Sequence, residues 1–207
     1  DAAGAPFVGH GGYRVVTEVQ EHPENKLLLA TAGAFTFVLS AIKLPSVTGS
    51  SSHPTGTGVG AALFKPPVMA FLGMIVLIFQ ALLLAHGGIS TLGANTFSMA
   101  IAGPWAGYAF YKLTKKLRGP DALAIFLCMV FSDFITYVVT SFQLAFAFPD
   151  ATGGFWGAVG KFLGIFAITQ VPLALIEGLV GILLFRFSAK VAATQLKQLV
   201  GREDNAE

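Results

Sequence analysis

The sequence predicts an all-α integral membrane protein, a bundle of about seven helices. Of its 207 residues, 54% are hydrophobic and only 12% are charged, whereas soluble domains carry about 25% charged residues. Mean hydropathy is +0.70, and several apolar runs are long enough to cross a bilayer. The net charge of +2 is too small to indicate a nucleic-acid partner.

Five runs match the roughly 20 apolar residues that a helix needs to cross a hydrocarbon core of about 30 Å. The opening segment, residues 2–16, is apolar but too short to cross alone, and we interpret it as the remainder of a longer helix. The five spans are residues 27–44, 66–85, 95–113, 122–146 and 160–187.

The basic residues require one further crossing. Lys and Arg near membrane ends prefer the cytoplasm, yet five spans alone would leave residues 112–118, with four positive charges, outside. Residues 53–64 are the remaining candidate, a helix of roughly 18 Å at 1.5 Å per residue. The resulting bundle, residues 1–187, has its N-terminal side outside, and residues 188–207 form a cytoplasmic tail.

A polar, Gly-rich loop at residues 46–58 carries His53. Irregular polar backbone beside lipid is tolerated only where protein or a cavity takes it up, and imidazole is a ligand for Co, Ni, Cu and Zn. A short, Gly-interrupted helix at membrane depth also indicates a binding site. His53 is therefore a candidate metal ligand at the start of the short helix; the alternative is a histidine that only caps this helix. The neighbouring hydroxyl residues expected around the site are Ser50, Ser51, Ser52 and Thr55.

A second loop, residues 86–95, is expected on the same side of the membrane. Its His86 is either a second ligand or, as we favour, a group that holds the loop around the site. Asn95 is expected to cap the helix that follows. Gln80 lies deep in the span before this loop.

Polar residues inside the spans are expected to face the bundle interior. They either line the metal site or form interhelical hydrogen bonds that only hold the bundle together. One set shares a face of the span at residues 122–146 and consists of Asp133, Thr136, Thr140 and Gln143. The other set shares a face of the last span and consists of Gln170 and Glu177.

Two small-xxx-small patterns, residues 103–107 and 160–164, predict close helix packing. Enzymatic chemistry is not indicated, because the sequence has no His-Glu-x-x-His or Cys-x-x-Cys motif. Gly160-Lys161 lacks the earlier glycine and the following Ser or Thr of a phosphate-binding loop. Cys128 lies in an apolar run and is interpreted as a packing residue.

The chain resembles the CbiM/NikM family, the substrate-binding membrane components of cobalt/nickel energy-coupling factor (ECF) transporters, and most closely its cobalt branch. The central motif is Ser52-His53-Pro54-Thr55-Gly56-Thr57-Gly58, and the Ala85-His86-Gly87-Gly88 loop also fits the cobalt branch. The resemblance covers nearly the whole chain, and its segments are residues 39–50, 52–58, 80–88, 92–100, 133–141 and 148–150.

The resemblance implies that His53 is a metal ligand and that Co(II), or Ni(II), is taken from outside as substrate, with no permanently bound cofactor. It implies a bacterial or archaeal cell membrane, cobalt supply to cobalamin biosynthesis, and three kinds of partner. These partners are a CbiQ-like membrane coupling subunit, CbiO-like ATPases and a small CbiN-like subunit. A nickel-specific component and an ATP-independent secondary metal permease remain the alternatives.

The sequence departs from the family pattern at two places. The family typically begins Met-His-Ile-Met-Glu-Gly, whose amine and histidine are metal ligands, whereas this sequence begins at Asp1. We expect that the first half of the first helix is missing from it. Ser51 stands where the cobalt branch usually has Cys, so a thiol is not expected to be required there.

Overall fold

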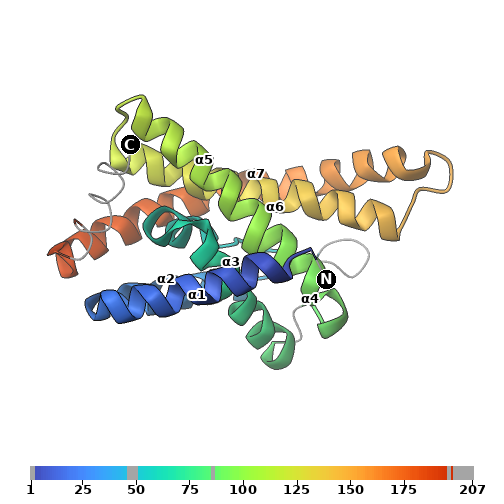
Figure 1. The fold of residues 1–207 in the computed structure, drawn as a ribbon. Helices are drawn as coiled ribbons and strands as arrows, with labels where there is room; N and C mark the ends of the chain where they lie inside the picture. The colour runs from blue at the N-terminus through green and yellow to red at the C-terminus, as the bar shows by residue number, and fades with distance from the viewer. Residues whose placement is uncertain (1–2, 46–50, 85–86, 195–196, 198–207) are drawn as a thin grey trace.

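The computed structural model is almost wholly helical and describes residues 3–45, 51–84, 87–194 and 197 (Figure 1). This confirms the predicted all-α fold class. Three helices, α3, α6 and α7, are long and apolar enough to cross a membrane. The main helices are α1 (Ala5–Glu21), α2 (Lys26–Ala41), α3 (Thr57–Leu83), α5 (Gly103–Lys116), α6 (Asp121–Ala147) and α7 (Gly154–Val191). The short elements are η1 (Pro23–Asn25), β1 (Leu44–Pro45), β2 (Ser51–Ser52), η3 (Ile89–Thr91), α4 (Leu92–Asn95) and the π-helix η4 (Thr96–Ala102).

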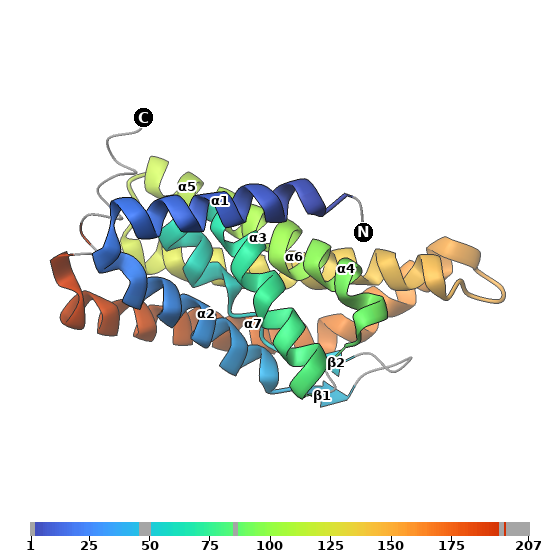
Figure 2. The ribbon, with the colours of Figure 1, turned by 60° about the horizontal axis from the view of Figure 1, so that its bottom comes forward.

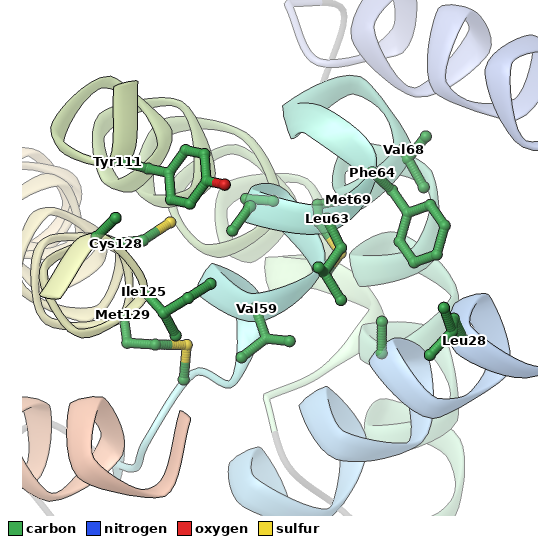
Figure 3. Close-up of a cluster of buried hydrophobic side chains, with 14 of the residues drawn as sticks. Leu28, Val59, Leu63, Phe64, Val68, Met69, Tyr111, Ile125, Cys128 and Met129 are labelled. Carbon is green, nitrogen blue, oxygen red and sulfur yellow. The ribbon is translucent and has the colours of Figure 1, made fainter. Parts of the chain in front are cut away.

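The helices lie side by side around α3, and α6 and α7 form a long hairpin whose loop extends beyond the rest of the bundle (Figures 1 and 2). The main apolar core joins α2, α3, α5 and α6, with Leu28, Phe64, Tyr111 and Met129 among its buried side chains (Figure 3). Cys128 belongs to this core, as the sequence predicts.

The helix α3 reverses direction at Lys65, where the sequence predicts the short helix to end. Lys65 has φ 69° and ψ 156°, and it precedes Pro66, which disfavours helical backbone at the residue before it. A Cβ on Gly60 would lie 2.1 Å from the Met69 sulfur, so the two halves of α3 pack directly on each other. The short half begins at Thr57 rather than at His53, which corrects the predicted boundary.

The reversal returns the chain to the end of the bundle that it left. Lys43, just after α2, donates from Nζ to the carbonyl oxygen of Leu84, just after α3, at 3.2 Å. The chain therefore turns back once between the end of α2 and the second half of α3. This is the additional reversal that the distribution of basic residues predicts.

The helix predicted from residue 95 begins earlier, at Leu92, and continues as η4 and α5. Asn95 does not cap it; its side chain lies 3.5 Å from the Thr91 hydroxyl. Gly103 and Gly107 do allow close packing, because a Cβ on either would come within 2.4 Å of an α6 atom. The second glycine pair was predicted wrongly, since a Cβ on Gly160 or Gly164 meets no described atom within 4 Å.

The loop between α6 and α7 is held by Asp150. Its Oδ1 accepts hydrogen bonds from the backbone N–H groups of Thr152 (3.0 Å) and Gly153 (2.7 Å), and its Oδ2 pairs with Lys161. The Lys161 ammonium and these N–H donors hold the pKa of the Asp150 carboxyl well below its usual range. The last helix begins at Gly154, six residues before the predicted span, and continues to Val191.

Candidate metal centre

His53 lies in an extended stretch between β2 and α3. The two short strands pair antiparallel, with Leu44 opposite Ser52, so the hairpin brings this stretch back toward the bundle after α2 (Figure 2). The side chain of His53 is half-buried. Ser50 and His86, also predicted near the site, lie outside the described residues.

Tyr137 of α6 holds the backbone of His53. The Tyr137 hydroxyl accepts a hydrogen bond from His53 N at 2.8 Å and lies 3.1 Å from His53 O, to which it donates. The two rings also meet edge to face, with centroids 5.9 Å apart. One buried side chain therefore fixes both the backbone of His53 and the side of its ring.

The neighbouring backbone fixes the tautomer of the His53 ring. Nδ1 lies 3.0 Å from the carbonyl oxygen of Pro54, and a carbonyl only accepts, so Nδ1 carries the proton. The lone pair of the neutral ring is then on Nε2, the arrangement typical of metal-binding histidines. This tautomer is compatible with the predicted role of His53 as a metal ligand.

Glu177 of α7 holds the turn between His53 and α3. One carboxylate oxygen accepts from Thr55 N at 2.6 Å, and the other accepts from Gly56 N at 2.9 Å and the Thr55 hydroxyl at 3.0 Å. These N–H groups lie at the N-terminal end of the short half of α3, where a negative charge is favourable. A fully buried carboxylate is therefore fully hydrogen-bonded at this turn.

Gly56 is required in this turn by both its conformation and its surroundings. Its φ is +70°, and a Cβ would lie 2.7 Å from the Thr36 Cα of α2. The Thr36 hydroxyl donates to Gly56 O at 3.0 Å. Gln80 reaches the same region indirectly, because its amide donates to Ser40, whose hydroxyl donates to Thr36 O.

The three predicted hydroxyl neighbours that the structure describes are distributed over the site. Ser52 lies 2.9 Å from the Thr169 hydroxyl of α7, and Thr55 binds Glu177. Ser51 contributes its carbonyl oxygen, which lies 3.4 Å from the Tyr137 hydroxyl. All three contact groups that hold the His53 segment.

The polar residues of α6 separate into two sets. Thr136 donates to Ser98 O at 3.3 Å and Gln143 donates to Ala94 O at 3.1 Å, so both bond to the backbone of α4 and η4 rather than to the His53 segment. Thr140 donates to the carbonyl of Thr136 within α6. Asp133 is fully buried and has Glu177 of α7 as its charged neighbour, which separates it from this set.

The sequence did not single out Tyr137, and it placed Glu177 only among general polar lining. The available signal was spacing, since Tyr137 lies one helical turn after Asp133 on a face already recognised as polar. Among the described residues, no three His, Cys, Asp or Glu side chains come together as a ligand set. His53 is therefore not part of such a cluster in the described part of the chain, and its role as a ligand stays a prediction.

A bundle with helices long and apolar enough to cross a membrane and one helix broken at Lys65 is an arrangement found in membrane transport proteins. Comparison with known proteins agrees with this class. The family described as the cobalt uptake substrate-specific transmembrane region, CbiM, matches residues 1–194. The chain belongs to the CbiM family, and it is accordingly a multi-pass membrane transport component rather than an enzyme.

Two relatives are both cobalt transport proteins CbiM. That of Propionibacterium freudenreichii subsp. shermanii is 72% identical over 204 residues, covering 99% of this chain and 87% of the relative. That of Streptomyces coelicolor is 59% identical over 197 residues, covering 95% and 85%.

Crystal structures of a transition metal transporter and of a truncated one share the fold. Their TM-scores are 0.69 and 0.74, and each is 22% identical in sequence to this chain. The first alignment covers 95% of this chain and 93% of that chain, and the second covers 90% and 91%.

Proposed function

We propose that this chain is the substrate-specificity subunit of an ATP-driven ECF transporter that imports Co(II), with cobalamin biosynthesis as the consumer. The observation that carries the proposal is His53, with Nδ1 protonated against Pro54 O and its backbone fixed by Tyr137. Membership of a cobalt uptake family and the cobalt transport proteins among its relatives support cobalt as the substrate.

The chemistry of the site assigns roles to three residues. His53 Nε2 binds the metal as one member of a nitrogen-rich ligand set. Tyr137 and Glu177 do not bind it but hold the His53 turn against α6 and α7, so that little ordering is left for the moment of binding. Nitrogen ligands bind Ni(II) more tightly than Co(II), so preference for cobalt rests on geometry or availability.

The proposed orientation places the N-terminal side and the β1–β2 hairpin outside the cell and the C-terminus in the cytoplasm. The basic residues support it, because Lys26, Lys65, Lys115 and Lys190 then all lie at the cytoplasmic end. The sequence contains no phosphate-binding loop of its own. We therefore assign ATP hydrolysis to CbiO-like subunits, coupled through a CbiQ-like membrane subunit, with a small CbiN-like subunit as a further partner.

The test is uptake of radioactive cobalt by cells that express the chain with its coupling subunit and ATPases. His53→Ala should abolish accumulation, and loss of one ligand should weaken cobalt binding by the purified protein at least about 10-fold. His22→Ala is the matched control, since His22 is a partly exposed histidine paired with Glu24 away from the site. Normal accumulation by His53→Ala contradicts the ligand assignment.

Two further measurements separate the alternatives. Competition of uptake by excess Ni(II) and Co(II) distinguishes a nickel-specific component, which should prefer nickel in intact cells. Vesicles that contain the chain without partner subunits should not move cobalt down its gradient. Partner-independent, saturable flux would instead identify a secondary permease.

A further inference from the structure

Asp133 is a buried acid without a hydrogen-bond donor among the residues that the structure describes. It is 0% exposed, and neither of its carboxylate oxygens has a hydrogen-bond partner in the described part of the chain. An unpaired carboxylate at membrane depth is expensive. Such a group takes up either a proton or a cation, and persists in membrane helices chiefly where ions move.

The packing of α6 on α7 shows what Asp133 faces. A Cβ on Gly181 would lie 2.7 Å from Met129, and the Tyr137 ring lies 5.0 Å from that of Phe166. Asp133 is four residues from both Met129 and Tyr137, so the antiparallel register places it at the level of Ala174 on α7. Ala174 is small and 2% exposed, and it lies between Gln170 and Glu177, which share its face.

Gln170 is the second unsatisfied group at this level. It is 1% exposed, and its amide lies beside the Tyr137 hydroxyl but makes no hydrogen bond of good geometry through either its oxygen or its nitrogen among the described residues. Glu177, in contrast, uses both oxygens on the turn at Thr55 and Gly56. A buried carboxylate on α6 and a buried amide oxygen on α7, about one helical turn apart along the packed pair, thus both lack donors among the described residues, and both are ligand types for divalent cations.

The next observation is where Asp133 lies along α6 relative to His53. Tyr137 bonds the backbone of His53 and lies 3.4 Å from the carbonyl oxygen of Ser51 in β2, and Asp133 lies one turn earlier, toward the N-terminal end of α6. Ser132 beside it bonds Thr57, the first residue of the short half of α3, at 2.8 Å. Asp133 is therefore the acidic residue on α6 that lies one helical turn away from the residue that holds His53.

We propose that Asp133 and the amide oxygen of Gln170 form a second, weaker site for a divalent transition-metal cation, which receives the substrate from His53. The inference rests on the proposed function, because it takes His53 as the first site. In the orientation proposed above, the second site lies on the cytoplasmic side of the first. The bound cation supplies the positive charge that Asp133 lacks.

The experiment counts Co(II) bound by the purified full chain as free cobalt is raised, and measures cobalt uptake by the assembled transporter in cells. Wild type should bind a second equivalent that Asp133→Asn does not bind, with the first equivalent unchanged. Uptake by Asp133→Asn should fall at least about 10-fold. Ser141→Ala removes a buried hydroxyl of the same helix that, among the described residues, bonds within α6, and should leave both readouts unchanged.

A measurement without variants guards against misfolding of Asp133→Asn. X-ray absorption of wild type should show nitrogen-rich coordination for the first cobalt equivalent and an oxygen-only shell for the second. A wild type that binds no second equivalent, or an Asp133→Asn variant that imports cobalt at the wild-type rate, overturns the second site. His53→Ala with normal uptake overturns the proposed function instead, whatever Asp133→Asn does.

Discussion

Glu177→Gln tests whether a carboxylate on α7 holds the turn that follows His53. The wild-type carboxylate accepts three hydrogen bonds, two from backbone N–H groups and one from the Thr55 hydroxyl. Glutamine retains one oxygen and presents an NH2 group in place of the other. If the glutamine oxygen keeps the bonds from Gly56 N and the Thr55 hydroxyl, its NH2 group takes the place of the oxygen that lies 2.6 Å from Thr55 N in the wild type. Two donors then face each other, and the bond from Thr55 N is lost.

The magnitude follows from these contacts. A hydrogen bond to a charged group contributes about 1.5–3 kcal/mol, and the two remaining bonds lose their charge assistance. Because Thr55, Gly56 and Glu177 are all fully buried, water does not replace what is lost. We expect unfolding to become easier by roughly 2–4 kcal/mol, a fall in Tm of about 5–15 °C for a chain of this length.

The assay is thermal unfolding of the detergent-purified protein, with Thr55→Ala and the double variant completing a cycle. Thr55→Ala alone removes the bond that its hydroxyl donates to Glu177, about 1.5–3 kcal/mol, and the longer bond that it accepts from Thr57 at 3.4 Å, and should cost less when Glu177 is already glutamine. Cobalt binding at His53 should weaken with Glu177→Gln, because the turn is no longer held. A Glu177→Gln protein that melts within about 2 °C of wild type, with additive effects in the cycle, refutes the role of Glu177.

Two other predictions concern packing and pH. Gly103→Ala should destabilise the protein by about 1–3 kcal/mol, because the new Cβ would lie 2.2 Å from the Thr136 hydroxyl. Gly164→Ala should be neutral, because its Cβ meets no described atom within 4 Å. Equal Tm values for the two variants would contradict the close packing assigned to Gly103. Asp150→Asn should lower Tm at neutral pH, since the folded-state pKa of Asp150 is depressed. The difference from wild type should stay constant above about pH 5 and shrink as pH falls below about 4, the ordinary carboxyl pKa; a difference that grows in acid would contradict the sign.

The sequence predicts most of the architecture because the membrane imposes simple constraints. Apolar length and the side preference of basic residues together predict the reversal at Lys65, which hydropathy alone does not separate from the span that follows it. The boundaries are less predictable. His53 was expected to begin the short helix, but Glu177 caps the turn at Thr55 and Gly56, and this distant contact starts the helix at Thr57.

The same limit applies to the site. His53 is identifiable because a histidine in a polar loop is unusual beside lipid, but its support comes from Tyr137 and Glu177, which lie 84 and 122 residues away from their partners in the sequence. Periodicity groups Asp133 with Thr136 and Gln143 on one polar face. Only the packing of α6 between η4 and α7 separates Asp133 from the other two. Their positions around the axis of α6 differ by less than a quarter turn, and this difference decides which neighbouring helix each side chain meets.

The broken helix explains why these supports are needed. The short half of α3 leaves N–H groups unsatisfied at its N-terminal end, and within a membrane no water is available to satisfy them. Glu177 meets this requirement at Thr55 and Gly56, and the turn it closes is the one that carries His53. Stability of the half-helix and geometry of the imidazole therefore depend on the same carboxylate, so a partner movement that shifts α7 would release both together.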